Sequence, residues 1–137
     1  MKFFLEIITP ERLAYKDEVD MVTAPTARGI IGVLAHHVPL FTRLLDGEVK
    51  ITKGSEEFFL AIGGGFMEVT KDRVSILVTR AVHARELNEV EIKKAESRAR
   101  DALSRGVKGA ELVEAQSLLR RTLLEMKVVR RKRLVIH

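Results

Sequence analysis

The stretch DGEVKITKGSEEFFLAIGGGFMEVTKDRVSILVT, residues 46–79, decides the fold of this chain. Short runs rich in Val, Ile and Phe alternate in it with turn signals such as Lys53-Gly54-Ser55 and Lys71-Asp72. Turns about every 8–12 residues between such runs are typical of a β-sandwich or barrel. Because no segment between the runs has the length and period of a helix, neighbouring strands should be mostly antiparallel.

The same pattern covers the N-terminal part of the chain, from Lys2 to Arg80. Thr9-Pro10 and Pro25 are placed to end the first two runs. We predict strands over residues 3–8, 19–24, 30–34, 38–45, 48–52, 57–62, 66–70 and 74–79. These short strands predict an antiparallel β-sandwich domain that covers residues 1–84.

After Glu86 the apolar residues recur at three- and four-residue steps, the period of an amphipathic helix. A first helix that ends at Ser104-Arg105-Gly106 is predicted from Leu87, Val90, Ala95, Ala99, Ala102 and Leu103. A second helix of about 20 residues is predicted from Leu112, Ala115, Leu119, Thr122, Met126 and Val129. Joined by a short loop, the two helices form an antiparallel two-helix hairpin domain over residues 85–137. Because the apolar residues of the first helix are mostly alanine, the contact between the two helices should bury little area, and the helices should separate easily.

Composition excludes several classes of function. The chain has 137 residues and no cysteine, which rules out disulfides, thiolate metal sites and cysteine nucleophiles. Its start, MKFFLEIITPERL, becomes charged too soon for a secretory signal, and no apolar run approaches the ~18 residues of a membrane span. We therefore expect a soluble, cytoplasmic protein.

The positive charge is concentrated in the C-terminal part of the chain. Residues 1–80 have a balance of −1 and residues 81–137 one of +6. Seven cations crowd the second predicted helix and the residues after it: Arg120, Arg121, Lys127, Arg130, Arg131, Lys132 and Arg133. Such a run is a solvated face, a contact for an acidic protein partner, or a contact for an anionic membrane. Nucleic acid is not indicated, because no Phe, Tyr or Trp follows Phe66.

Two motifs that suggest binding sites favour structural roles instead. His36 and His37 are adjacent, and adjacent strand residues point to opposite faces, so the pair should not hold a metal ion together unless it lies in a turn. Gly63, Gly64 and Gly65 lie between predicted strands rather than before a helix, which favours close backbone approach over phosphate binding. We therefore predict no catalytic site, metal ion or cofactor.

Six motifs follow one another along almost the whole chain. They are LEIITPERLAYKDEV at 5–19, GIIGVL at 29–34, HVPL at 37–40, GGFMEV at 64–69, VSILVTRA at 74–81 and ELNEVEIKKAESRARDAL at 86–103. In this order they resemble the epsilon subunit of bacterial and chloroplast F-type ATP synthases, whose mitochondrial counterpart is the delta subunit. The resemblance implies a β-sandwich of about ten strands followed by the helical hairpin.

The resemblance further implies a non-catalytic rotor subunit. Its sandwich would join the gamma subunit to the membrane-embedded c ring, at the cytoplasmic face of the bacterial cell membrane. Its hairpin would extend, transiently, toward the catalytic alpha/beta hexamer and restrain ATP hydrolysis.

Named residues receive roles from the same resemblance. The segment near the c ring includes Ile30, His37, Pro39 and Leu40. Family members often carry a polar or acidic residue where this chain has Ile30, and usually Pro and Gly where it has Ala35 and His36. The contact with the ring should therefore be apolar. The basic residues expected to face an acidic segment of the beta subunit are Arg120, Arg121, Arg130, Arg131 and Arg133.

A second interpretation stays open on the residues alone. The chain would then be a free-standing β-sandwich protein that binds an anionic surface, lipid or RNA, through its basic tail. The two interpretations differ in their partners. A rotor subunit co-purifies with gamma and the c ring, whereas the alternative predicts salt-sensitive binding without them.

ATP is the one ligand that the resemblance brings into question. Some bacterial members bind it on the hairpin through the motif Ile/Leu-Asp-x-x-Arg-Ala. Aligned on residues 97–99, the motif falls on residues 87–92, where only Leu87 matches. Asn88 lacks the carboxylate, and Glu91 places a negative charge where a guanidinium belongs. Two supporting arginines remain, Arg98 and Arg121, while Glu125 replaces a third.

We predict that the isolated subunit does not bind ATP at millimolar concentration. Glu91 repels a nucleotide that carries about four negative charges, and two arginines do not compensate for it. Calorimetric titration checks this. A dissociation constant below about 1 mM, equivalent to roughly −4 kcal/mol, would contradict the prediction.

Overall fold

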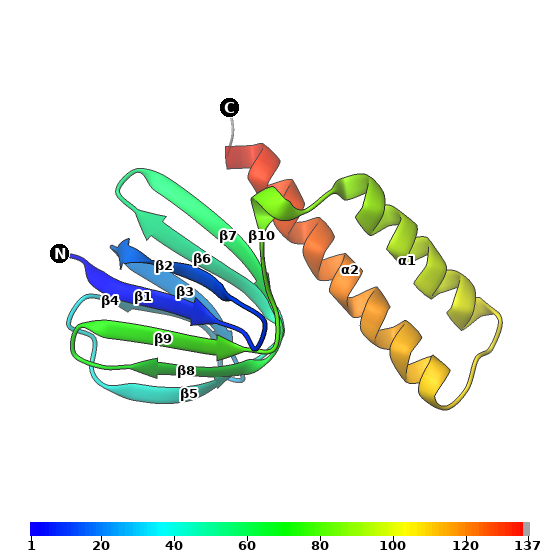
Figure 1. Cartoon of the computed structure of the whole chain (residues 1–137), viewed down its shortest axis with the longest axis horizontal. Helices are drawn as coiled ribbons and strands as arrows, with labels where there is room; N and C mark the ends of the chain where they lie inside the picture. Colours follow the sequence, from blue (N-terminus) through cyan, green and yellow to red (C-terminus); the bar gives the residue numbers. More distant parts are fainter. Residues whose placement is uncertain (136–137) are drawn as a thin grey trace. The chain divides into compact units, whose positions relative to one another are not determined.

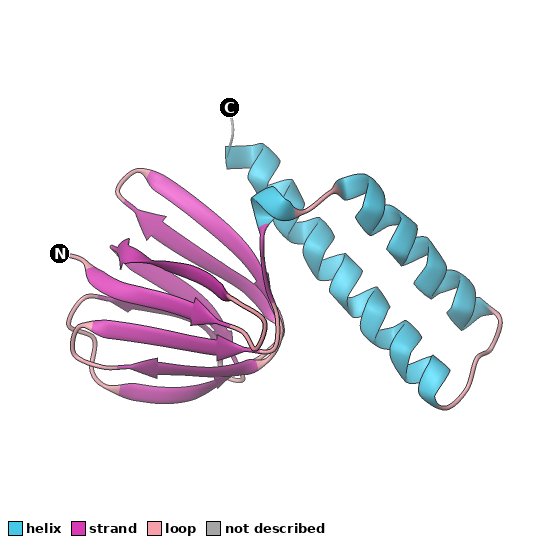
Figure 2. Cartoon of the chain, viewed as in Figure 1, coloured by secondary structure: helices cyan, strands magenta, loops and turns pink. Residues whose placement is uncertain are grey.

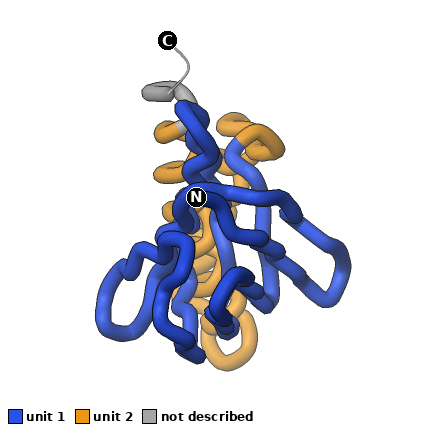
Figure 3. Tube along the Cα trace, turned by 90° about the vertical axis from the view of Figure 1, so that its left-hand side faces the viewer, with its two compact units in different colours: residues 1–84 blue, residues 85–137 orange. Residues whose placement is uncertain are grey.

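The computed structural model describes the backbone of residues 1–135 and the side chains of residues 1–131 (Figure 1). It divides into two compact units, of which the first is Met1–Ala84 and the second begins at Arg85 (Figure 3). None of the described helices is long and apolar enough to span a membrane.

Ten strands form the first unit (Figure 2). They are β1 (Phe3–Ile8), β2 (Leu13–Val19), β3 (Met21–Thr26), β4 (Gly29–Leu34), β5 (Leu40–Leu44), β6 (Gly47–Lys53), β7 (Glu56–Ile62), β8 (Gly65–Val69), β9 (Arg73–Val78) and β10 (Ala81–His83). Their order is β10-β7-β6-β3-β5-β8-β9-β1-β2, with β4 paired to β3. Every pairing is antiparallel except that of β1 with β9. The predicted sandwich is confirmed.

β3 joins the two layers of the sandwich. Its first half pairs with β6, where Val22 lies opposite Ile51. Its last residue, Thr26, pairs instead with Leu44 of β5, and Pro25 accepts a hydrogen bond from the Leu45 amide at 3.0 Å. One strand therefore belongs to both layers, and the space between them fills with side chains from alternate positions.

The core follows the two-residue period of the strands. In β1, Phe3, Leu5 and Ile7 are buried while the residues between them are only partly so, and β9 repeats the pattern. Burying one such side chain stabilises the fold by about 1.5–3 kcal/mol. The alternate apolar residues of each strand in the sequence are therefore the residues that form the core.

Side-chain contacts, rather than backbone pairing between strands, hold β2 next to β10 and β6. The Arg12 guanidinium donates to the Ala81 carbonyl at 2.6 Å, and His83 Nε2 donates to the Ala14 carbonyl at 2.6 Å. Lys53 also forms an ion pair with Asp17. This charged hydrogen bond lowers the pKa of the Asp17 carboxyl and raises the pKa of Lys53.

Three details of the predicted strands are wrong. β2 was not predicted, because LAYKDEV carries three charges and lacks strict apolar alternation, as edge strands often do. β10 was missed because it has only three residues. β3 begins at Met21 and continues through Pro25, because the carbonyl of this proline still accepts a hydrogen bond although it has no N–H to donate.

The glycine cluster has the predicted structural role. A Cβ added to Gly65 would collide with the Leu77 carbonyl oxygen and lie 2.7 Å from the Val78 Cα. Only glycine therefore allows β8 and β9 to approach this closely.

The second unit is a hairpin of α1 (Glu89–Ser104) and α2 (Ala110–Val135), preceded by a short 3-10 turn at Ala84–Glu86. Asn88 caps α1, since its side-chain oxygen accepts hydrogen bonds from the amides of Val90 and Glu91 at 2.9 and 3.3 Å. Gly106 and Gly109 have φ of 73° and 65° in the loop, a conformation that favours glycine. The predicted fold class, a sandwich followed by a helical hairpin, is thus confirmed.

Two features of the hairpin differ from the prediction. Val90 is 60% exposed, and Ile92 is buried in its place, in a cluster with Met126 and Val129. α2 has 26 residues rather than about 20, because the charged run after Val129 consists of arginine and lysine, which are good helix formers.

We predict that residues 1–84 fold without the hairpin, because the strands of the first unit bury a core of their own. Circular dichroism of this fragment should show a cooperative β-type melt. A fragment of residues 1–70 is the control, since it lacks β9, which lies between β8 and β1, and it should not melt cooperatively. A disordered spectrum of residues 1–84 would refute the two-domain organisation.

Candidate functional site

The histidine pair lies in a turn between β4 and β5, not in a strand. The argument from opposite strand faces therefore does not apply to His36 and His37, which are the excepted case of a turn. His36 has φ 64°, and His37 Nδ1 donates to the Val38 carbonyl at 2.7 Å. Within residues 1–131, no three His, Cys, Asp or Glu side chains are grouped so that they could hold a metal ion.

His36 occupies a backbone conformation in which glycine is favoured. A residue with a Cβ in this left-handed region costs roughly 1 kcal/mol, although histidine tolerates it better than most. The turn reverses the chain after Leu34, and the His37 amide donates to the Leu34 carbonyl at 3.2 Å. It thereby ends β4 and exposes the loop that follows.

An exposed apolar strip runs along β4 and this loop. We call Ile30, Leu34, Val38 and Pro39 the β4 surface. Ile30 is 73% and Val38 71% exposed, while Leu34 and Pro39 are exposed too. Large aliphatic side chains gathered in water mark an interaction site more often than single ones do.

The four residues predicted near the c ring are not all in this strip. Ile30 and Pro39 are exposed, whereas His37 is half-buried and Leu40 packs on the core. Ile30 and Leu34 lie about 13 Å apart, because four residues of extended strand separate them. Ile30 therefore lies at one end of β4, and His37 and Pro39 follow its other end.

Leu34 and Val38 were not predicted, although the alternation of β4 contains the signal. Ile31 and Val33 point inward, so Ile30, Gly32 and Leu34 must point outward.

A second exposed apolar surface lies on β5, β8 and β9. Phe41 and Phe66 stack with their ring centroids 5.5 Å apart and their planes at 19°. Leu77 pairs in register with Phe66, so the two side chains point to the same face. Phe41 is 65% exposed. We call these three residues the aromatic face.

The two surfaces point away from the core on different layers. The β4 surface extends the layer that contains β3 and β6, and the aromatic face covers the layer of β5, β8 and β9. Phe41 and Phe66 were not predicted at the surface, although each lies two residues from a charged side chain, Arg43 and Glu68, that shares its row of the strand.

The basic residues of α2 do not share one face. At about 100° per residue, Arg120 and Arg131 lie on one side of the helix, with Lys127 between them. Arg121 and Arg130 are each turned away by roughly a quarter turn, in opposite directions. Arg120 donates to the Ser117 hydroxyl at 3.3 Å. Arg133 lies in α2, but its side chain is outside the described residues.

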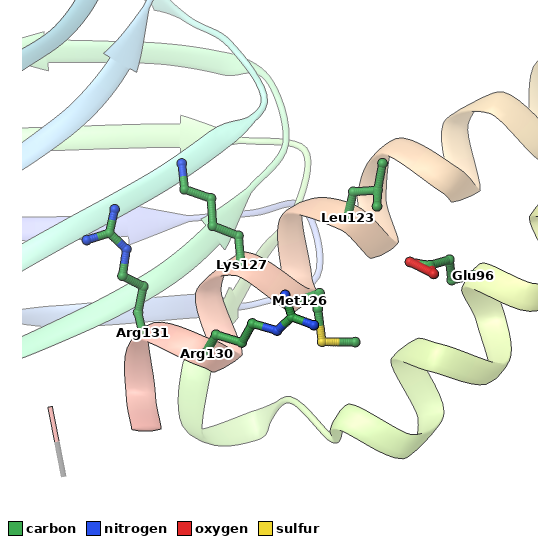
Figure 4. Close-up of a pocket in the computed structure, with 6 residues that line it drawn as sticks. All are labelled: Glu96, Leu123, Met126, Lys127, Arg130 and Arg131. Atoms are coloured by element: carbon green, nitrogen blue, oxygen red, sulfur yellow. The ribbon is translucent and has the colours of Figure 1, made fainter. Parts of the chain in front are cut away.

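A groove of about 340 Å³ lies between the helices beside these cations (Figure 4). Leu123 and Met126 form its apolar part, and its charged lining is Lys127, Arg130, Arg131 and, from α1, Glu96. The carboxylate of Glu96 also pairs with Arg100 at 3.6 Å. This mixed lining suits a protein segment better than a free anion.

Residues 2–84 match the family model described as ATP synthase, Delta/Epsilon chain, beta-sandwich domain. A protein named ATP synthase epsilon chain from Dehalococcoides mccartyi strain CBDB1 is 38% identical over 133 residues, which are 96% of this chain and 95% of the relative. One from Herpetosiphon aurantiacus is also 38% identical over 133 residues, 97% of this chain and 98% of that one. The chain belongs to the ATP synthase delta/epsilon family.

Solved structures share the fold of this family member. A chain in the Euglena gracilis mitochondrial ATP synthase, solved as OSCP/F1/c-ring, has a TM-score of 0.69 at 20% identity and covers 99% of this chain and 82% of its own length. A chain from the Tetrahymena thermophila central stalk and c ring has a TM-score of 0.57 at 19% identity, with 94% and 97% covered.

Family membership makes the chain a non-catalytic component of ATP synthase, which is a membrane-associated complex. The positions that align with the ATP motif of the family have other contacts in this chain. The Asn88 side chain caps α1, and Glu91 lies 3.8 Å from the Lys94 ammonium. The absence of ATP binding stays a prediction.

Proposed function

We propose that the chain is a central-stalk subunit that couples gamma to the c ring and restrains ATP hydrolysis through its helices. The observation that supports this most is the pair of exposed apolar surfaces on one sandwich. A coupling subunit has to hold two partners at once, and each partner needs its own apolar contact. An enzyme would instead have a concave pocket on which a few polar groups converge.

We assign the β4 surface to the c ring and the aromatic face to gamma. The first assignment follows the family, in which residues 29–40 lie near the ring. The second follows from exclusion, since Phe41, Phe66 and Leu77 form the other exposed apolar group of the sandwich on a separate layer. Stacked aromatic side chains are also frequent anchors at the centre of protein interfaces.

The same proposal gives the chain its location. As a peripheral subunit it would lie at the cytoplasmic face of a bacterial cell membrane. The named relatives, which include the chains from Dehalococcoides and Herpetosiphon, are consistent with a bacterial source.

Co-purification tests the coupling role. Tagged chain should bring gamma and the c ring out of solubilised membranes. Replacing Phe41 and Phe66 by Ser should weaken binding to gamma, whereas replacing Ile30 and Val38 by Ser should weaken binding to the ring and leave gamma bound. Val113→Ser is the matched control, since Val113 is an exposed apolar residue of α2.

Two outcomes would contradict the coupling role. Equal loss of both partners in both variants would refute the assignment of surfaces. Recovery of neither partner, with salt-sensitive binding to anionic vesicles or RNA, would favour the alternative function.

Restraint of hydrolysis is assigned to the cations of α2. The opposing acidic segment would belong to the beta subunit of the alpha/beta hexamer. Exposed ion pairs are worth only about 0.2–1 kcal/mol each, so several must act together. Because the arginines lie on more than one side of the helix, a partner has to surround α2 rather than cover one stripe.

We predict that replacing Arg120, Arg121, Arg130, Arg131 and Arg133 together by Ala relieves inhibition of ATP hydrolysis and leaves assembly intact. Steady-state hydrolysis by the assembled complex measures this. The matched control replaces Arg98 and Arg100 of α1 and Arg105 at its C-cap, which removes positive charge from the other helix. Unchanged hydrolysis in the first variant, or equal relief in both, would contradict the role of α2.

A further inference from the structure

β4 is an edge strand with one free side. It pairs with β3 over its whole length, from Gly29 opposite Thr26 to Leu34 opposite Met21. No other strand among residues 1–135 pairs with it. Its second row of backbone amides and carbonyls therefore faces away from the sheet.

Pro25 identifies the residues of that free row. It lies opposite Ile30, and because proline has no N–H, the two residues cannot exchange a pair of hydrogen bonds. Hydrogen-bonded and non-hydrogen-bonded pairs alternate along antiparallel strands. Gly32 and Leu34 are therefore also at positions whose backbone groups do not hydrogen-bond to β3. The amides of Ile30, Gly32 and Leu34 consequently point to the open edge.

One carbonyl of this outward row already accepts a hydrogen bond within the chain. The Leu34 carbonyl accepts from the His37 amide at 3.2 Å, which agrees with its pointing away from β3. The N–H and C=O of Ile30 and Gly32 and the N–H of Leu34 are left for a further strand. Their spacing is that of a normal antiparallel ladder.

The other edges of the sandwich are charged or short, and β4 is neither. The outer side of β5 pairs with β3 only at Leu44, and that strand carries Arg43. β2 carries Lys16, Asp17 and Glu18 and is tied to Lys53. β10 has only three residues, and its Ala81 carbonyl accepts from Arg12. β4, with the sequence GIIGVL, has no charge and no proline. An unprotected edge of this kind is a template for adding a strand.

Charge around the edge argues against a second copy of the chain as the added strand. Antiparallel pairing of two β4 strands about Gly32 would bring Arg28 of each copy beside His36 of the other. In that arrangement neither copy offers a carboxylate to the Arg28 of the other. A strand with a carboxylate at the end next to Arg28 would fit instead.

We propose that an extended segment of another ATP synthase subunit adds to β4 as a further strand. The segment is uncharged where it lies against residues 30–34 and acidic where it meets Arg28. The inference rests on the proposed function, since it concerns how the β4 surface holds a partner. Backbone pairing at this edge adds to the apolar contacts of Ile30 and Leu34.

Amide hydrogen exchange tests this in the assembled complex. In the free chain, the amides of Ile30, Gly32 and Leu34 should exchange fast, whereas those of Ile31 and Val33 should be protected by β3. Assembly should slow the first three by at least about a hundredfold. Apolar docking alone would not produce protection of every second amide along one strand.

The outcomes separate the two proposals. A chain that assembles while these three amides continue to exchange fast overturns the added strand and leaves the coupling role standing. A chain that does not assemble overturns the coupling role, and the added strand with it.

A variant pair gives an independent test. Ile30→Pro removes an outward amide that no strand of the sandwich uses, so the fold should persist, as a thermal melt will show. Ile30→Ala is the matched control, because it shortens the side chain but keeps the amide. Ile30→Pro should weaken assembly about tenfold more than Ile30→Ala, the effect of one lost hydrogen bond. Equal effects would overturn the proposal. Should Ile30→Pro unfold, the exchange experiment on the native chain still decides.

Discussion

The pairing of β3 with three other strands is the constraint on which the rest of the sandwich depends. Val22 lies opposite Ile51 of β6, Thr26 lies opposite Leu44 of β5, and the whole strand pairs with β4. The two layers are therefore held in register by one continuous backbone. Pro25 makes this division possible, since its carbonyl accepts from Leu45 while its missing N–H requires no partner. The same proline determines which amides of β4 face outward.

Both apolar surfaces follow from this arrangement. With the core side chains assigned to one row of each strand, the other row has to face water or a partner. On β2, and where Arg73 of β9 pairs with Glu6 of β1, that row carries charges. The Ser75 hydroxyl and then Arg73 lower the pKa of Glu6. On β4, β5 and β8 the row carries Ile30, Phe41 and Phe66 instead. This difference is the basis on which we assign the proposed partner contacts to the apolar rows.

The sequence predicted much of the fold because local patterns determine it. Eight strands and both helices follow from apolar period and turn residues, which are properties of neighbouring positions. β2 and β10 were missed because contacts at long sequence separation stabilise them, such as those of Arg12 with Ala81 and of His83 with Ala14. The left-handed turn at His36 was missed for a similar reason, since histidine only tolerates this conformation.

The candidate site was less predictable than the fold. Ile30 and Pro39 were expected at the surface from the family and are exposed, yet His37 and Leu40 lie closer to the core. The aromatic face was missed because Phe is typical of a core, although Phe41 and Phe66 share their rows with the charged residues Arg43 and Glu68. The register of β5 against β8, with Phe41 opposite Glu68 and Arg43 opposite Phe66, brings these two rows to the same face and lets the rings stack.

The two units also differ in what it costs to rearrange them. The sandwich core contains Leu, Ile and Val. Opening it would expose these side chains to water, at a cost of about 1.5–3 kcal/mol for each. The hairpin seam has small residues at its centre, Ala99 and Ala115, and leaves a groove of about 210 Å³ toward the loop. Its larger apolar contacts, Ile92 with Met126 and Val129, lie at the opposite end. Most of the free energy that holds the two helices together therefore comes from this one cluster. Once its side chains separate, little apolar contact is left between the helices. A rigid sandwich for coupling and a separable hairpin for restraint require this contrast in side-chain size.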